Sequence, residues 1–270
     1  MTPSEEPRRW DVAGRQLVGV LHHPTSGAPR SAVLIIHPFG EEKKFSHRVL
    51  VNLSRELARR DVASLRFDLS GCGDSFGESA DRTLDDWLYD IDSACNQFEL
   101  HHQPAPIVVL GLRLGATLAL AAQSDNPWAK ALVLWEPVIS GRKYIDEILR
   151  RRMIKEMMTT GKKATGREQV LAQLDADGFL DLDGIAVGRQ LIEDISALDA
   201  NAFAESFTGK ALCVQIAVNA KVSSALEALA QKIADAEAIG IREQVIWDRV
   251  ELVEATELID TTADWIVGLG

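Results

Sequence analysis

A short glycine-flanked motif, Gly111-Leu112-Arg113-Leu114-Gly115, stands between an apolar run of strand length and a segment of small residues that reads as a helix. Two glycines at this spacing permit the sharp strand-to-helix turn called a nucleophile elbow, where a flanking Cβ would clash. The central residue of such a turn attacks the substrate. Here it is Arg113, whose guanidinium stays protonated and cannot act as a nucleophile. The motif therefore predicts a turn with the geometry of a nucleophile elbow but without a nucleophile at its centre.

A second segment, Gly73-Asp74-Ser75-Phe76-Gly77, fits the G-x-S-x-G pattern literally. It lies in a glycine-rich loop rather than at a strand-to-helix turn, so we expect Ser75 to be structural. The loop also fails the dinucleotide-binding pattern G-x-G-x-x-G, because Phe76 stands where the last glycine is required.

The apolar pattern around these motifs repeats strand, loop and helix. Residues 9–22 alternate as two antiparallel strands, and further strands are expected at 31–36, 62–67, 107–110, 131–135, 211–218 and 242–247. Helices are expected at 46–60, at 84–99, from about 115, at 223–238 and at 256–267. Runs rich in Val, Ile and Leu between amphipathic helices predict an α/β fold, with a mostly parallel sheet covered on both faces.

Residues 141–208 interrupt this alternation. They are expected to be helical at 144–158 and 189–198, with a polar stretch around 161–167 between the two helices. We interpret 141–208 as a helical cap inserted into a core made of residues 1–140 and 209–270.

These features together resemble the α/β-hydrolase superfamily along nearly all of the chain, through the elbow motif, the loop His37-Pro38-Phe39-Gly40 and the run from Asp68 to Ser75. Within it, Glu41-Glu42, Gly-Cys-Gly-Asp-Ser, Gly-Leu-Arg-Leu-Gly-Ala and Trp135-Glu136-Pro137 with Ser140-Gly141 resemble the exosortase-A-system-associated hydrolases of the second type. The resemblance implies an α/β-hydrolase fold with an eight-stranded sheet. It also implies a bacterial cytoplasmic protein linked to clusters for polysaccharide or surface-protein export.

The same resemblance implies a triad in the chain order nucleophile, acid, histidine. All six histidines lie at or before His102, and the expected histidine loop at 248–252 has none. The loop after residue 218 begins Asn219-Ala220-Lys221 and offers no acid. All three triad positions are therefore substituted.

Arg113 is expected over the carboxyl ends of the central strands, beside a helix N-terminus, where open α/β sheets bind ligands. By resemblance, the loop from His37 to Gly40 is the oxyanion loop, so the amides of Phe39 and Leu114 are expected to face the same space. The candidate ligand-binding residues are Arg113, Leu114, His37, Phe39, Gly40 and Glu136. A guanidinium with free amides suits a carboxylate, a phosphate or a carbonyl group.

Each candidate also has a structural interpretation. Arg113 could pair with Glu136 or Asp68 and fill a defunct pocket. His37 could hold its loop by hydrogen bonds. Alternatively, His37 or Glu136 could act as a general base, so these two residues are the only catalytic candidates. The stretch from Glu41 to Lys44 is expected to be a mixed-charge approach to a helix, from which a glutamate could reach the pocket mouth.

The cap is locally basic, because Arg150-Arg151-Arg152 and Lys155 are close in sequence. This is either a solvated helix face or a surface that guides anionic ligands or docks an acidic partner. Met153, Met157 and Met158 beside it are expected in the core or in an adaptable lid.

Composition limits the functions further. With 46% apolar and 26% charged residues, the chain is typical of a soluble globular protein, and its net charge of −11 disfavours nucleic acid and anionic lipid as partners. Cys72, Cys95 and Cys213 lack metal-ligand spacing, so neither a metal nor a cofactor is expected. No stretch reaches the roughly 18 apolar residues of a membrane span, and we expect a cytoplasmic location.

Three functions agree with these residues. The first is a degenerate hydrolase fold, a pseudoenzyme, that binds an anionic or carbonyl-containing small molecule. The second is a hydrolase or acyltransferase that acts on esters or thioesters by non-triad chemistry. The third is a structural partner protein with a closed pocket, which binds another protein or a second copy of itself.

Overall fold

The computed structural model describes residues 4–26, 29–102, 105–124, 127–160, 167–249, 251 and 253–269. Its centre is an eight-stranded sheet with the strand order β1-β2-β4-β3-β5-β6-β9-β10. Strand β2 pairs antiparallel with β1 and β4, and the remaining neighbours are parallel. The predicted mostly parallel α/β sheet is confirmed.

The strands of this sheet are β1 (Ser4–Val12), β2 (Arg15–His23), β3 (Ser31–Ile36), β4 (Val62–Asp68), β5 (Ile107–Leu112), β6 (Ala131–Trp135), β9 (Lys210–Ala217) and β10 (Asp235–Arg242). The helices that surround it are α1 (Glu41–Arg59), η1 (Ser79–Asp81), α2 (Leu84–His102), α3 (Leu114–Ala121), α8 (Ser224–Ala230) and α9 (Thr256–Val267).

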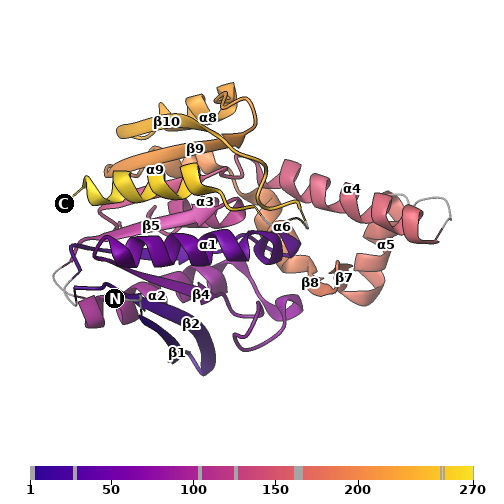
Figure 1. Ribbon diagram of the computed structural model, residues 1–270. Helices are drawn as coiled ribbons and strands as arrows, with labels where there is room; N and C mark the ends of the chain where they lie inside the picture. Colours follow the sequence, from indigo (N-terminus) through magenta and orange to yellow (C-terminus); the bar gives the residue numbers. More distant parts are fainter. Residues whose placement is uncertain are drawn as a thin grey trace.

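Helices cover both faces of the sheet (Figure 1). Helices α1 and α9 pack on one face, and α2, α3 and α8 pack on the other, each with its own cluster of buried side chains. Every residue of β3 is buried, because a central parallel strand meets a helical layer on each side.

The segment between β6 and β9 holds α4 (Gly141–Thr160), α5 (Arg167–Asp177), β7 (Phe179–Leu182), β8 (Ile185–Gly188), α6 (Arg189–Ala197) and α7 (Ala200–Ala204). Helices α4 and α5 project from the sheet together with the β7–β8 hairpin (Figure 1). The polar stretch expected from residue 161 lies outside the described residues up to 166.

The β7–β8 hairpin was not predicted. Its turn residues Asp183 and Gly184 both have positive φ angles, 58° and 90°. An Asp-Gly pair between alternating apolar residues is a strong hairpin signal, because such a two-residue turn matches the twist of its strands. The sequence Leu180-Asp-Leu-Asp-Gly-Ile-Ala-Val187 carried that signal.

The predicted helix 223–238 and strand 242–247 are wrong in their bounds. Helix α8 ends at Ala230, and β10 runs from Asp235 to Arg242, paired in parallel with β9 over its whole length. Alanine and glutamate favour a helix locally, but the free edge of β9 supplies backbone partners that outweigh this preference. Ile246 and Trp247 instead lie buried in a loop.

A buried polar pair joins β2 to β4 on the face covered by α1. His22 is fully buried, and the guanidinium of Arg66 donates to its Nε2 at 3.3 Å from Nε. Burial, followed by the positive charge of Arg66, lowers the pKa of His22 to about 4. The fold therefore holds His22 neutral.

This pair predicts acid sensitivity. The pKa of His22 is lower in the folded chain than its ordinary 6.5, so the unfolded state binds the extra proton and stability is lost as pH falls from 6.5 towards 4. The unfolding free energy of the wild type should decrease between pH 7 and pH 5. We expect this decrease to be smaller by about 2 kcal/mol in His22→Gln, which keeps an acceptor for Arg66. Urea unfolding at both pH values measures this.

The matched control is His23→Gln, because the neighbouring His23 side chain is partly exposed and keeps contact with solvent. It should leave the pH dependence of the wild type unchanged. Equal slopes for His22→Gln and the wild type would contradict the assignment.

Candidate functional site

Arg113 occupies the sharp turn between β5 and α3. Its backbone angles are φ 55° and ψ −121°, a strained combination for a residue with a side chain. A Cβ on Gly111 would lie 2.3 Å from the carbonyl oxygen of Gly115, and one on Gly115 would lie 2.4 Å from that of Ile36. Both glycines are therefore required by close packing, and the geometry expected of a nucleophile elbow is present with arginine at its apex.

The guanidinium of Arg113 is held on several sides. Its Nε lies 3.3 Å from Oε1 of Glu42, and its Nη2 lies 3.6 Å from Oε2 of Glu147. Its Cζ lies 5.5 Å from the ring centre of Tyr144 and 5.0 Å from that of Trp247, within the range of cation–π attraction. Only 13% of the side chain is exposed, so Arg113 is engaged by the protein itself.

Glu42 is the principal partner of Arg113 and lies buried in the first turn of α1. Its Oε2 accepts a hydrogen bond from the Tyr144 hydroxyl at 3.0 Å, and Arg151 approaches its Oε1 to 3.6 Å. Burial raises the pKa of Glu42, and the charge of Arg113 opposes that rise most strongly. The carboxylate therefore depends on the cations around it.

The expected partners of Arg113 were wrong. Among the described residues no ion pair joins Arg113 to Glu136 or Asp68, because Asp68 pairs with Lys43 at 2.6 Å. Helix α1 begins at Glu41, five residues before the predicted start at Ser46, and this places Glu42 over the elbow.

Glu136 follows β6 with a positive φ of 47°. Its Oε1 accepts hydrogen bonds from the Gln215 side-chain amide and from the Ile216 backbone amide, both at 2.6 Å. Burial raises its pKa, although the Ile216 amide and the charge of Arg113 oppose the rise. These contacts tie β6 to β9, which is a structural role.

His37 lies behind the elbow. Burial, helped by the nearby charges of Lys43 and Arg66, lowers its pKa, so the imidazole is neutral, and its Nδ1 has no partner in the described part of the chain. It lines a cavity of about 20 Å³ together with Phe39 and Leu114, which has room for one water molecule.

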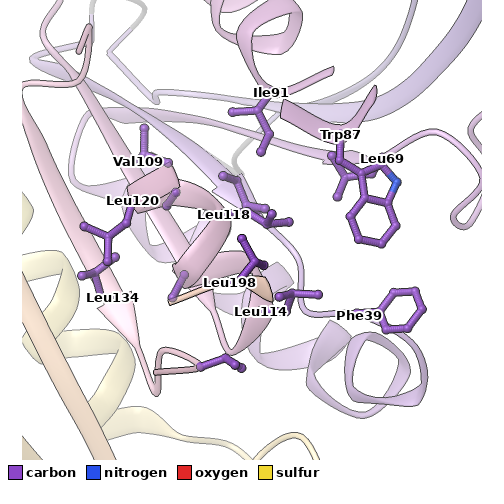
Figure 2. Packing of buried hydrophobic residues seen from close by; sticks show 14 of the residues in the cluster. Phe39, Leu69, Trp87, Ile91, Val109, Leu114, Leu118, Leu120, Leu134 and Leu198 are labelled. Atoms are coloured by element: carbon purple, nitrogen blue, oxygen red, sulfur yellow. The ribbon is translucent and has the colours of Figure 1, made fainter. Parts of the chain in front are cut away.

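The side chains of Phe39 and Leu114 belong to the core. The Phe39 ring lies 5.5 Å from that of Trp87, and Figure 2 shows Leu114 and Leu118 on the same side of this pair. Both side chains therefore serve packing, although Phe39 also lines the larger cleft. Gly40, at the N-terminus of α1, has a positive φ of 66° and lines the larger cleft described next.

A cleft of about 990 Å³ opens beside the Arg113 ion pair, between α1, α4 and the loop after β10. Glu42, Tyr144 and Trp247, which hold Arg113, form one of its walls. Other parts of the lining are apolar, namely Phe39, Phe45, Ile148, Ile154, Met158, Leu182 and Val253. Its lining also has five Lys or Arg and five Asp or Glu, so the cleft carries no net charge.

Sequence reasoning brought together Phe39, Gly40 and Arg113 and named Arg151 as part of a basic surface that could guide anionic ligands, but it missed Tyr144 and Trp247. Tyr144 and Arg151 lie seven residues apart on one face of α4, a spacing that could have revealed their shared surface. Trp247 gave no such signal, since it lies in a loop.

The loop after β10 begins at Glu243, earlier than expected, and still holds no histidine before α9. Ser75 is structural as expected, because its hydroxyl donates to the carbonyl oxygen of Asp68 at 2.5 Å and accepts from the Val18 amide.

The described residues also contain no group of three or more His, Cys, Asp or Glu side chains that could hold a metal ion. Across the same residues, no helix combines the length and the apolar character needed to cross a bilayer.

Comparison with known proteins agrees with this geometry. Residues 27–233 match the family described as serine aminopeptidase, S33. None of the curated proteins matches the chain.

Several solved structures share the fold. Est1E from Butyrivibrio proteoclasticus with ferulic acid bound has a TM-score of 0.71 at 21% identity, over 97% of this chain and 98% of that one. Proline iminopeptidase from Mycobacterium smegmatis has a TM-score of 0.67 at 13% identity, over 98% of both chains. The enol-lactonase from Burkholderia xenovorans LB400 has a TM-score of 0.63 at 16% identity, over 97% and 99%. These identities show the α/β-hydrolase fold alone.

The ion pair predicts a pH-dependent effect of Arg113→Ala. Removal of the guanidinium leaves Glu42 buried with fewer compensating charges, so we expect a loss of about 3 kcal/mol in unfolding free energy at pH 8. Burial already raises the pKa of Glu42, and the loss of Arg113 raises it further, so the carboxyl takes up a proton more readily as pH falls. The loss should therefore shrink between pH 8 and pH 5 in urea unfolding.

The double variant Arg113→Ala/Glu42→Gln removes the buried charge and should recover part of the lost stability. Arg249→Ala, which removes an exposed ion pair, is the control and should change stability by less than about 0.5 kcal/mol. A loss for Arg113→Ala that is the same at both pH values would contradict this role of Glu42.

Proposed function

Because the chain belongs to the serine aminopeptidase S33 family of α/β-hydrolase folds but carries arginine at the elbow, we propose that it is a non-catalytic member of this family. It binds a small carbonyl-containing or anionic molecule in the cleft beside Arg113. The observation that carries this proposal is the guanidinium of Arg113, which is engaged by Glu42 at the nucleophile position while a cleft of about 990 Å³ stays open next to it.

Chemistry argues against turnover. A permanently charged guanidinium cannot form an acyl intermediate, and no imidazole follows β10 to relay a proton. The two weak catalytic candidates are occupied elsewhere: Glu136 holds the amides of β9, and His37 lies behind the elbow in the small cavity. Neither of these two residues lines the cleft, which argues against the second hypothesis, non-triad catalysis on esters by His37 or Glu136.

The size of the cleft argues for a ligand rather than for a purely structural role. In a closed pocket the Arg113 ion pair would fill all of the space. Here the pair forms only one wall of the cleft. A cavity of this volume is typical of small-molecule sites, and its ten charged side chains stand among apolar ones. Est1E, of similar fold, has ferulic acid bound, which shows that a small organic acid is one ligand that such a fold takes.

The polar end of the ligand is expected at the wall where Arg151 and Trp247 meet, and its apolar part along Ile148 and Leu182. Arg151 is paired with Glu42, Glu147 and Asp248, and a ligand carboxylate or carbonyl would share its N–H groups with these acids.

The resemblance to the exosortase-A-system-associated hydrolases of the second type completes the proposal. It supports a bacterial, cytoplasmic protein that accompanies an export system, with residues 141–208 as its cap. The resemblance rests on the short motifs of the elbow, the loop at Glu41-Glu42 and the segment Trp135-Glu136-Pro137.

Absence of catalysis is tested with a panel of acyl esters, thioesters and small amides. We expect no saturable turnover from the wild type, from Arg113→Ala or from Arg113→Ser, because a serine at the elbow still lacks an acid and a histidine. Turnover by the wild type that disappears in Arg113→Ala would contradict the proposal and would place a non-triad reaction at the elbow.

Ligand binding is tested through Trp247, which lines the cleft. Titration with octanoate and with octanamide should change the tryptophan fluorescence of the wild type, and Trp247→Phe should lose this signal. Arg151→Gln should weaken octanoate about tenfold, as expected for the loss of one hydrogen bond to a charged group, and should affect octanamide less. Failure of both probes to bind, in fluorescence and in equilibrium dialysis, would contradict the proposed ligand class.

A further inference from the structure

The far half of α4 carries three exposed apolar side chains close together. Ile154, Met157 and Met158 are 44%, 45% and 79% exposed, and their spacing of three and four residues places them on one face of the helix. The other large exposed apolar side chains that the structure describes lie on separate elements, namely Phe76, Tyr89, Phe179 and Val218. Single exposed apolar residues are ordinary, whereas a cluster on one face indicates a contact surface.

The same helix is basic in an acidic protein. Six Lys or Arg and three Asp or Glu lie between Gly141 and Thr160, whereas the whole chain has a net charge of −11. Exposed Arg150 stands one turn before Ile154 on the apolar face. We call the residues Arg150, Ile154, Met157 and Met158 the α4 surface.

The position of the α4 surface separates it from the acidic body. Figure 1 shows that the far part of α4 projects beyond the sheet. Because charges are screened over about 8 Å at physiological salt, a surface that approaches this end meets the basic helix before it meets the acidic core. An anionic surface repels the acidic core, so the molecule approaches such a surface with α4 first.

We propose that the α4 surface docks on an anionic lipid membrane and that the cleft takes an amphiphilic ligand from it. A helix with Met and Ile on one side and Arg and Lys beside them lies in the headgroup region of such membranes. This contact is at the interface and needs no spanning helix. It departs from the expectation drawn from the net charge of −11, which disfavours anionic lipid as a partner of the average surface.

Continuity with the cleft favours lipid over an acidic protein. Ile154 and Met158 belong to the α4 surface and also line the cleft, so these two apolar side chains, beside Arg151 and Lys155, form a path from the exposed helix into the cleft. An acidic protein partner would use the charge but would have no need of this path. The transfer of a ligand rests on the proposed function, whereas the docking does not.

The test is cosedimentation of the full chain with vesicles of phosphatidylcholine, with and without phosphatidylglycerol. The wild type should bind the anionic vesicles, bind the neutral ones weakly and be released by salt. The variant Arg150→Gln/Met157→Ser should lose more than about tenfold in affinity, since one surface cation alone accounts for about fivefold. Phe76→Ser/Arg242→Gln, which removes one exposed apolar and one exposed basic side chain elsewhere, should bind as the wild type does.

Octanoate binding, measured through Trp247, separates this proposal from the previous one, because neither Arg150 nor Met157 lines the cleft. It should be unchanged in Arg150→Gln/Met157→Ser. Lack of binding to anionic vesicles, or equal binding by this variant and the wild type, would overturn the membrane proposal whatever octanoate does. Binding to polyglutamate but not to vesicles, abolished in the same variant, would overturn it in favour of an acidic protein partner.

Discussion

The buried ion pair between Glu42 and Arg113 is the interaction on which the arrangement of the site depends. It joins the first turn of α1 to the turn between β5 and α3, and through Tyr144 and Arg151 it extends to α4. Neither charge is favourable at this depth alone, since burial raises the pKa of Glu42. The two therefore fix each other, and α4 is anchored to the elbow where a substrate carbonyl would otherwise lie against a nucleophile.

The elbow keeps its shape for reasons of packing rather than of reaction. Gly111 lets β5 approach the first turn of α3, and Gly115 lets α3 approach the backbone at the end of β3, so closely that no Cβ fits at either position. A chain with this sheet needs the glycines whether or not the residue between them attacks anything. The strained backbone of Arg113 is accordingly evidence of the fold, and the function must be argued from the side chains around it.

The space near the elbow has two unequal parts, and Phe39 lines both. The first, lined by His37 and Leu114, has room for one water molecule, and the second, the large cleft, reaches the exposed end of α4. A protein that binds a ligand without converting it needs the second part and not the first. The balance of charges in the cleft and the basic, apolar end of α4 agree with a ligand that has a polar head and an apolar body.

The sequence by itself determined the α/β architecture, most strand positions and the elbow glycines, because these follow from local periodicity and from glycine spacing. It also carried the signal of the β7–β8 hairpin, but it did not determine the partner of Arg113, the position of β10 or the place of Trp247. Glu42 and Arg113 are 71 residues apart, and only the packing of α1 on the sheet brings them together. Strand β10 formed where its composition favours a helix, because the open edge of β9 offered backbone partners that no local pattern reveals.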